Sequence, residues 1–192
     1  ICDANGYTLD IPAWCWVQGE QDTKNSMSAS TYKTKLLALQ NKYCNSVETI
    51  TGITERPKCI VYQPSCQNLF DPTAEYNYSY DHMGVPTAFM ELLRDNDEFV
   101  ASIPTYIFDP ANSGGVWIHL NEQSYKLLGA YQGYALKRLI IDGERNQGVV
   151  PLNISVDDNT ITIKYNVPCP PLCFDTCYVN AAPNMGFNVI KS

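Results

Sequence analysis

Two carboxyl side chains and one amide side chain, groups that can exchange a proton or donate hydrogen bonds, follow one short apolar run. The run extends from Ile11 to Val17, the length of a single buried strand, and it breaks at once into a polar turn that contains a glycine. Gln18, Glu20 and Asp22 lie in this turn. Because ligands bind at the carboxyl ends of the strands in an open α/β sheet, these side chains are expected to face a crevice. The alternative is a solvated connection from the strand to a helix.

A second candidate is His119, which is predicted to lie on a loop just before a helix. Residues 109–115 form a turn rich in glycine and polar residues, and Asn121 is of a type that caps a helix. The helix after Asn121 is expected to carry Tyr125, Leu128, Tyr131 and Ala135 on one face. Gly129 and Gly133 are expected to let this helix approach the sheet closely.

The stretch between these two groups predicts the elements that position them. Residues 26–30 form a capping region, and residues 32–43 have apolar side chains at helical spacing. Residues 44–56 are interpreted as a linker, and residues 57–63 as a buried parallel strand with a polar exit. These patterns alternate strand and helix, which is typical of an α/β protein.

The next stretch predicts a second helix and a third strand. Pro86 is expected near the start of a helix that ends near Asn96. Residues 99–107 are expected to form a strand, interrupted by Pro104.

The composition changes after Gly143. Residues 149–156 and 161–167 alternate apolar and polar side chains around a turn at 157–159, which predicts a β-hairpin with one buried face. The hairpin either packs on the preceding domain or begins a β-sandwich, because so few strand residues do not form a stable core alone.

The charge, apolar runs and cysteines of the chain bear on whether it binds nucleic acid, a membrane or a metal. The net charge of the 192 residues is -7, and the basic residues form no cluster, so a nucleic-acid partner is not expected. No apolar run is long enough to span a membrane.

The 8 cysteines are predicted to be reduced, mostly structural thiols, with Cys15 and Cys59 on buried strands. The spacing of Cys169, Cys173 and Cys177 does not match a zinc motif, so neither a metal nor a cofactor is predicted.

Two blocks of this sequence resemble a known family. The residues Trp16-x-Gln18-Gly19-Glu20-x-Asp22 resemble the central block of the SGNH hydrolase superfamily, in the branch of the sialate O-acetylesterases and related carbohydrate acetylesterases. Residues 116–121 followed by 125–129 resemble the last block of that family. The resemblance covers about residues 7–142. It implies a three-layer α/β/α sandwich with a parallel, flavodoxin-like sheet over residues 1–147, followed by a small β-rich segment over 148–192.

The resemblance also implies roles for individual residues. His119 is expected to be the general base, and Gln18 is expected to donate its side-chain NH₂ to an oxyanion. Gly19 is expected to allow close approach of the backbone, and Glu20 to brace the site through hydrogen bonds. Asp22 is expected to fix the following turn. The residues expected to contact the substrate are Trp16 and Gln63.

The sequence departs from the family pattern in two places. No turn with a nucleophilic serine precedes Trp16, which favours a piece of a longer polypeptide over a domain that has lost its nucleophile; Ser65 is a weaker candidate nucleophile. Val116 stands where the family has an aspartate, and a valine cannot accept a hydrogen bond from the imidazole. Asp109 or Glu20 could substitute for that acid.

Two functions remain open at this stage. The first is a carbohydrate O-acetylesterase that acts on acetylated glycans. The second is a non-catalytic descendant of the same fold that serves as a structural or glycan-binding module of a larger assembly. Proteins of the resembled kind with an appended β-module occur in gut bacteria and their phages, so an extracellular, cell-surface or virion location is favoured.

Overall fold

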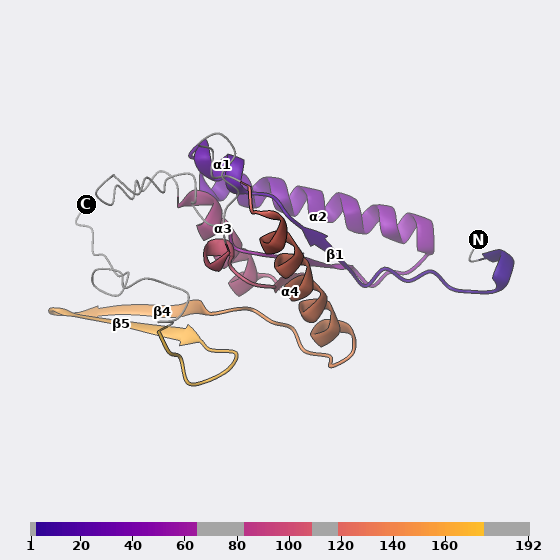
Figure 1. The fold of residues 1–192 in the computed structure, drawn as a ribbon. Helices are drawn as coiled ribbons and strands as arrows, with labels where there is room; N and C mark the ends of the chain where they lie inside the picture. The colour runs from indigo at the N-terminus through magenta and orange to yellow at the C-terminus, as the bar shows by residue number, and fades with distance from the viewer. Residues whose placement is uncertain (1–2, 65–82, 109–118, 175–192) are drawn as a thin grey trace.

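The computed structural model describes residues 3–64, 83–108 and 119–174. Over these residues the chain is a mixed α/β protein with a three-stranded parallel sheet and a separate two-stranded antiparallel sheet (Figure 1). Ser65, Asp109, Val116 and Cys177, which the sequence singled out, lie outside the described residues.

The parallel sheet follows the order of the chain. Its strands are β1 (Ala13–Trp16), β2 (Lys58–Val61) and β3 (Phe99–Ala101), in the order β1-β2-β3. Trp16 pairs with Val61, and Val61 pairs with Ala101, so the carboxyl ends of the three strands meet at one edge of the sheet. The polar residues that follow these strands are therefore brought together.

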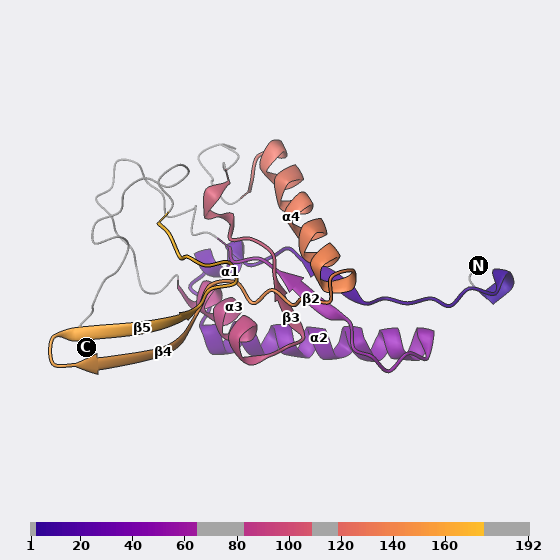
Figure 2. The ribbon, with the colours of Figure 1, turned by 90° about the horizontal axis from the view of Figure 1, so that it is seen from below.

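Helices cover both faces of the sheet. The helices are α1 (Glu20–Lys24), α2 (Ala29–Thr51), α3 (Gly84–Asp95) and α4 (Glu122–Ile140). Helices α2 and α3 contact each other and share a hydrophobic cluster with one face of the sheet. Helix α4 shares a second cluster with the opposite face, and Figure 2 shows it across the sheet from α2.

The alternation of side chains along β2 explains this arrangement. Cys59 and Val61 pack in the cluster with α2 and α3, whereas Ile60 packs with Ala135 of α4. Successive side chains of a strand point to opposite faces, so a strand that is apolar throughout is buried on both. Cys59, Ile60 and Val61 are fully buried, as expected for a central strand.

Helix α2 is longer than the sequence predicted. It begins after the N-cap Ser28, whose hydroxyl accepts a hydrogen bond from the Thr31 amide, and the predicted capping region is confirmed. It does not end near residue 43, because Cys44 and Val47 continue the buried stripe through the predicted linker. The helix ends at Gly52, whose left-handed backbone (φ 72°) is readily adopted by glycine.

Two further predictions are wrong in detail. The strand expected over residues 99–107 ends at Ala101, and a short 3₁₀ helix, η4 (Thr105–Ile107), follows Pro104. Cys15 is exposed rather than buried, because β1 lies at an edge of the sheet that the structure describes. Cys59, on the central strand, is buried as predicted.

The predicted hairpin is present, but its apolar face is exposed. Strands β4 (Val150–Asp157) and β5 (Thr160–Asn166) are antiparallel, and Ile154 pairs with Ile163. Leu152, Ile154 and Val156 are all about half exposed or more. Within the part of the chain that the structure describes, the hairpin reaches the core at its base, where Val150 joins the cluster formed with α2 and α3.

A buried polar network joins the amino ends of the three strands. The Gln40 side chain is fully buried; its Oε1 accepts from Trp14 Nε1 at 2.8 Å, and its Nε2 donates to Pro57 O at 2.7 Å. The same nitrogen donates to Glu98 Oε2 at 3.2 Å, and Glu98 also forms an ion pair with Arg56. Every hydrogen-bonding atom of the Gln40 amide group is thus satisfied, which makes its burial favourable.

Helix α4 confirms one prediction and corrects another. The Asn121 side chain accepts a hydrogen bond from the Ser124 amide at 2.8 Å, so Asn121 is the predicted N-cap. Gly129 and Gly133 do not allow a close approach to the sheet, because a Cβ at either position would meet no atom within 4 Å. Among the described helices, none combines the length and apolar character needed to cross a membrane.

Candidate functional site

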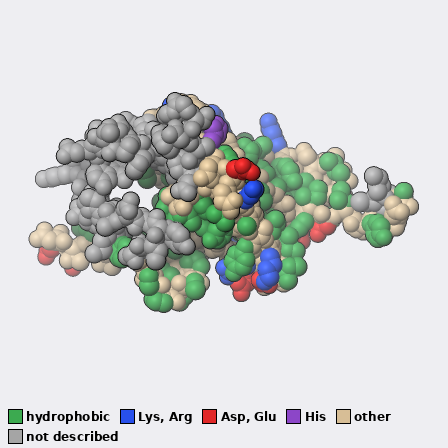
Figure 3. Space-filling model, viewed as in Figure 1, with side chains coloured by type: hydrophobic (Ala, Val, Ile, Leu, Met, Phe, Trp, Pro, Cys, Tyr) green, Lys and Arg blue, Asp and Glu red, His purple; other side chains and the backbone are tan. Residues whose placement is uncertain are grey.

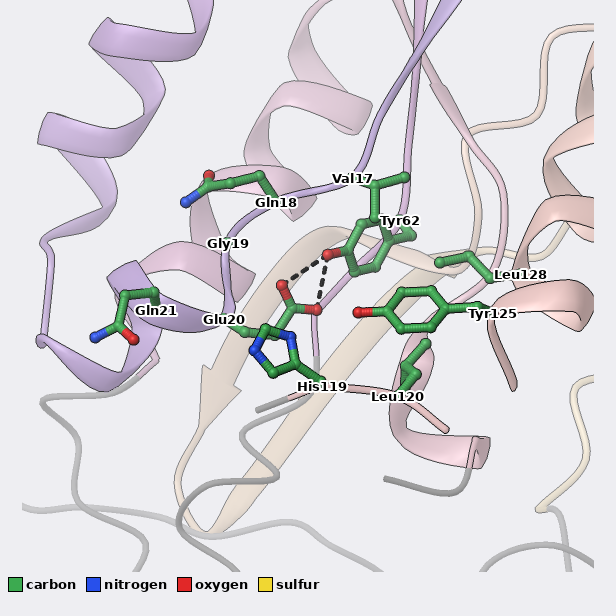
Figure 4. A pocket seen from close by; sticks show the side chains of 10 residues that line it. All are labelled: Val17, Gln18, Gly19, Glu20, Gln21, Tyr62, His119, Leu120, Tyr125 and Leu128. Atoms are coloured by element: carbon green, nitrogen blue, oxygen red, sulfur yellow. Dashed lines mark hydrogen bonds between the residues drawn. The ribbon is translucent and has the colours of Figure 1, made fainter. Parts of the chain in front are cut away.

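A pocket of about 250 Å³ lies at the carboxyl ends of β1 and β2 (Figure 4). Its walls come from the turn after β1, from the end of β2 and from the start of α4. The lining residues are Val17, Gln18, Gly19, Glu20, Gln21, Tyr62, His119, Leu120, Tyr125 and Leu128. The two stretches singled out by the sequence, around Glu20 and around His119, therefore meet in one pocket.

Gly19 gives the turn after β1 its shape. Its backbone lies at φ 148° and ψ -21°, a conformation that side-chain-bearing residues rarely adopt. It is buried, and a Cβ there would lie 3.1 Å from both Pro64 Cγ and Val85 Cγ1. The close approach predicted for Gly19 is thus made by the protein core beneath the turn.

Substitution of Gly19 by alanine is expected to destabilise the fold. The strained backbone and the two close contacts together are expected to lower the free energy of unfolding by about 2–3 kcal/mol. The matched control is Gly129→Ala, at a helical site with open space, where the gain in helix propensity is expected to stabilise by up to about 1 kcal/mol. Urea denaturation of both variants measures the difference; equal stabilities would contradict this account of Gly19.

The Glu20 carboxylate is held by Tyr62. The Tyr62 hydroxyl lies 2.7 Å from Glu20 Oε1 and 2.8 Å from Oε2, and it donates its proton to the carboxylate. Burial raises the pKa of Glu20 above its ordinary value, while the Tyr62 hydrogen bond and the charge of His119 act in the opposite direction. Glu20 is therefore a partly desolvated carboxyl group beside an imidazole.

His119 reaches the pocket from the segment before α4. Leu120 is buried against Tyr62 and Leu128, and Asn121 caps the helix, so the backbone on the carboxyl side of His119 is fixed. The imidazole itself is exposed, and Figure 3 shows histidine, in purple, at the molecular surface. In Figure 4 the ring lies beside the Glu20 carboxylate. The imidazole is therefore accessible from solvent.

Gln18 is held on the side of the turn that faces α2. Tyr32 donates its hydroxyl proton toward the Gln18 backbone oxygen and Oε1, at 3.0 and 2.9 Å, and Gln18 Nε2 donates to Asp22 Oδ2 at 2.6 Å. Asp22 thus fixes the turn through Gln18. The Gln18 amide group has two N–H bonds, so the second remains for another acceptor.

Trp16 and Gln63, the residues predicted to contact a substrate, do not line the pocket. Trp16 donates from Nε1 to the Tyr32 hydroxyl at 3.1 Å and packs on the core. The Gln63 backbone oxygen accepts from the Thr105 amide at 3.0 Å and so connects the end of β2 to η4. Both residues support elements around the pocket.

Sequence reasoning missed Tyr62 and Tyr125 as pocket residues. Tyr62 was part of the predicted strand, and Tyr125 was assigned only to one face of a helix; its side chain is 45% exposed. One signal for Tyr62 was available: it is a hydroxyl-bearing residue at the carboxyl end of the central strand.

The pocket holds a carboxyl group and an imidazole beside an apolar wall. None of its described lining residues is a serine, threonine or cysteine, and the described residues contain no cluster of histidine, cysteine and carboxylate side chains suited to a metal ion. An imidazole and a carboxyl group are the side chains of this lining that could exchange a proton with a bound molecule. Comparisons with protein-family models, with curated proteins and with solved structures found no match.

Proposed function

We propose that the protein is a carbohydrate O-acetylesterase in which His119 is the general base and Glu20 is the carboxylate that orients it. One observation carries the proposal: the Glu20 carboxylate, bonded to Tyr62, lies beside the His119 imidazole in a pocket. A carboxylate that accepts a hydrogen bond from an imidazole fixes the ring tautomer and stabilises the imidazolium form. The proposal assigns this bond to Glu20 and His119 in the complex with substrate. Glu20 takes the place of the acid that Val116 cannot supply.

The same proposal includes a three-layer α/β/α fold of the SGNH type. It is supported by the parallel sheet, by the clusters that α2, α3 and α4 form on its two faces, and by a pocket at the carboxyl ends of the strands. Ligand sites at that edge are the rule for open α/β sheets.

In the proposed reaction the nucleophile is a serine outside the described residues. Its oxygen forms a bond to the acetyl carbonyl carbon while His119 takes its proton. The tetrahedral intermediate collapses, and the proton passes from His119 to the departing sugar oxygen. Water then attacks the acetyl-enzyme by the same route, which releases acetate. The free N–H of Gln18 is the proposed donor to the oxyanion, which requires its amide to reach the carbonyl oxygen.

A non-catalytic role is the second candidate function. It is favoured by the absence of a serine, threonine or cysteine from the described lining of the pocket. In that role the protein is a glycan-binding or structural module, and the pocket binds an acetylated sugar without cleaving it.

Acetate release from an acetylated sugar by the native protein tests the proposal. His119→Gln is expected to lower kcat by at least about 1,000-fold, because it removes the base. His82→Gln substitutes the other histidine of the chain and is the matched control, expected to retain activity. A large loss in the His82 variant alone would contradict the assignment of His119.

Fluorophosphonate labelling followed by mass spectrometry separates the two candidate functions. A labelled serine, with labelling abolished in His119→Gln, is the result expected for an esterase. A label at Ser65 would place the nucleophile inside this chain. Absence of both acetate release and labelling in the native protein would overturn the esterase proposal and favour the binding module.

A further inference from the structure

Tyr62 is a pocket residue whose ring is held on several sides by the core. It follows β2 directly and is only 2% exposed. Its ring stacks on Phe89 of α3, with 6.3 Å between centroids and an interplanar angle of 24°, and it shares a cluster with Phe108, Leu120 and Leu128. Core packing on several sides therefore fixes the ring, and the ring fixes its hydroxyl at the pocket.

The Tyr62 hydroxyl contacts both oxygens of Glu20 almost equally, at 2.7 and 2.8 Å. Glutamate has three rotatable side-chain bonds, and this bifurcated contact restricts them. One hydroxyl supplies one proton, whereas a carboxylate accepts about four hydrogen bonds, so acceptor sites remain on the side away from Tyr62. Figure 4 shows the His119 ring on that side of the carboxylate.

We propose that Tyr62 is a positioning residue that aims the Glu20 carboxylate at His119 and keeps it ionised. The effect of Tyr62 on catalysis rests on the proposed function, whereas its positioning of the Glu20 carboxylate does not. The buried phenol suits the task, because burial and the charge of Glu20 raise the pKa of Tyr62, and it therefore stays a proton donor. Without this donor, the desolvated carboxyl group would take up a proton at a higher pH.

Other titratable groups around Glu20 come from every neighbouring element. They are His119 before α4, Tyr125 on α4, Tyr32 on α2 and Asp22 within α1. Among the described residues, only Tyr62 has a recorded side-chain hydrogen bond to the Glu20 carboxylate. Removal of the Tyr62 hydroxyl therefore removes this hydrogen bond to Glu20 specifically.

The test is Tyr62→Phe, which keeps the buried ring and removes only the hydroxyl. The pKa of Glu20 is measured by carbon NMR of labelled glutamate carboxyl groups, with the Glu20 signal assigned by its loss in Glu20→Gln. The pKa of Glu20 is expected to rise by about one pH unit, since the net value of one hydrogen bond to a charged group is of that order. Tyr32→Phe, which removes a buried hydroxyl not bonded to Glu20, is the NMR control.

Kinetics then test the catalytic part. In Tyr62→Phe the acid limb of the kcat/KM profile is expected to move to higher pH with the pKa of Glu20. At its pH optimum kcat is expected to fall about 10-fold, with KM nearly unchanged. A side chain that merely filled the core would move neither the pH profile nor the pKa of Glu20.

The outcomes separate this inference from the proposed function. An unchanged pKa of Glu20 in a folded Tyr62→Phe variant overturns the positioning role whatever the activity. A raised pKa in a native protein that hydrolyses no ester supports the positioning of Glu20 and counts against the esterase. A raised pKa with an unaltered pH profile in an active enzyme overturns the catalytic consequence.

Discussion

Glu20→Gln is expected to lower the rate of ester hydrolysis by about 1,000- to 10,000-fold while leaving the protein folded. The amide still accepts a hydrogen bond from Tyr62, but it carries no negative charge to stabilise the protonated imidazole of His119. The loss is expected in kcat, because the interaction becomes strongest when the imidazole is charged. A comparison of kcat for Glu20→Gln and for Gln21→Glu, which alters a neighbouring lining residue, measures the effect.

The stability of this variant relative to the native protein follows from the raised pKa of Glu20 in the native protein. A carboxyl group whose pKa is higher in the folded than in the unfolded state lowers stability as the pH rises through these two pKa values. At neutral pH the ionised Glu20 therefore costs stability, and Glu20→Gln is expected to unfold at an equal or higher urea concentration than the native protein. A variant that is inactive because it unfolds would contradict this account.

Arg145→Ala is expected to destabilise the protein by about 3 kcal/mol, because buried carbonyl groups lose a charged donor. The half-buried Arg145 donates from Nε to Phe99 O at 2.9 Å, and from Nη2 to Leu93 O at 2.8 Å and Asn96 O at 2.7 Å. It thus caps the end of α3 and the start of β3 at once. Urea denaturation monitored by circular dichroism measures the loss.

The control for Arg145 is Arg94→Ala. Arg94 pairs with Asp95, and both side chains are at least a third exposed, so this substitution is expected to cost less than about 1 kcal/mol. Arg145→Lys is expected to recover only part of the stability, because an ammonium group lacks the planar fork that reaches three carbonyls. Equal losses in Arg145→Ala and Arg94→Ala would show that the carbonyl contacts contribute little.

Elements with a strong period or a clear cap could be predicted from the sequence. The buried strand β2, the N-cap at Asn121 and the turn of the β4–β5 hairpin all agree with the structure. The length of α2 could not be predicted from the sequence, because the polar residues among 44–51 resemble a linker. The side chains of this stretch that are buried can be recognised only once the helix is packed on the sheet. Helix propensity predicts the end of a helix poorly where tertiary packing determines it.

The candidate site was predicted in part. Glu20 and His119 could be singled out by residue type and position, and the structure brings them into one pocket. The position of Tyr62 at the carboxyl end of the central strand indicated a place near the pocket, but the sequence could not predict its hydrogen bond to Glu20, because the two residues are 42 positions apart. The contacts of Trp16 with α2 and of Gln63 with η4 could not be predicted either, because they join residues far apart in the sequence.

The network around Gln40 has a consequence for the order in which the molecule folds. Its partner Trp14 lies in β1, and its partners Pro57 and Glu98 directly precede β2 and β3, so the network is complete only when all three strands are assembled. Interactions absent from the folding transition state act mainly on the rate of unfolding. We therefore expect loss of the Gln40 network to raise the rate of unfolding more than it lowers the rate of folding, and this network stabilises the edge of the sheet opposite the pocket.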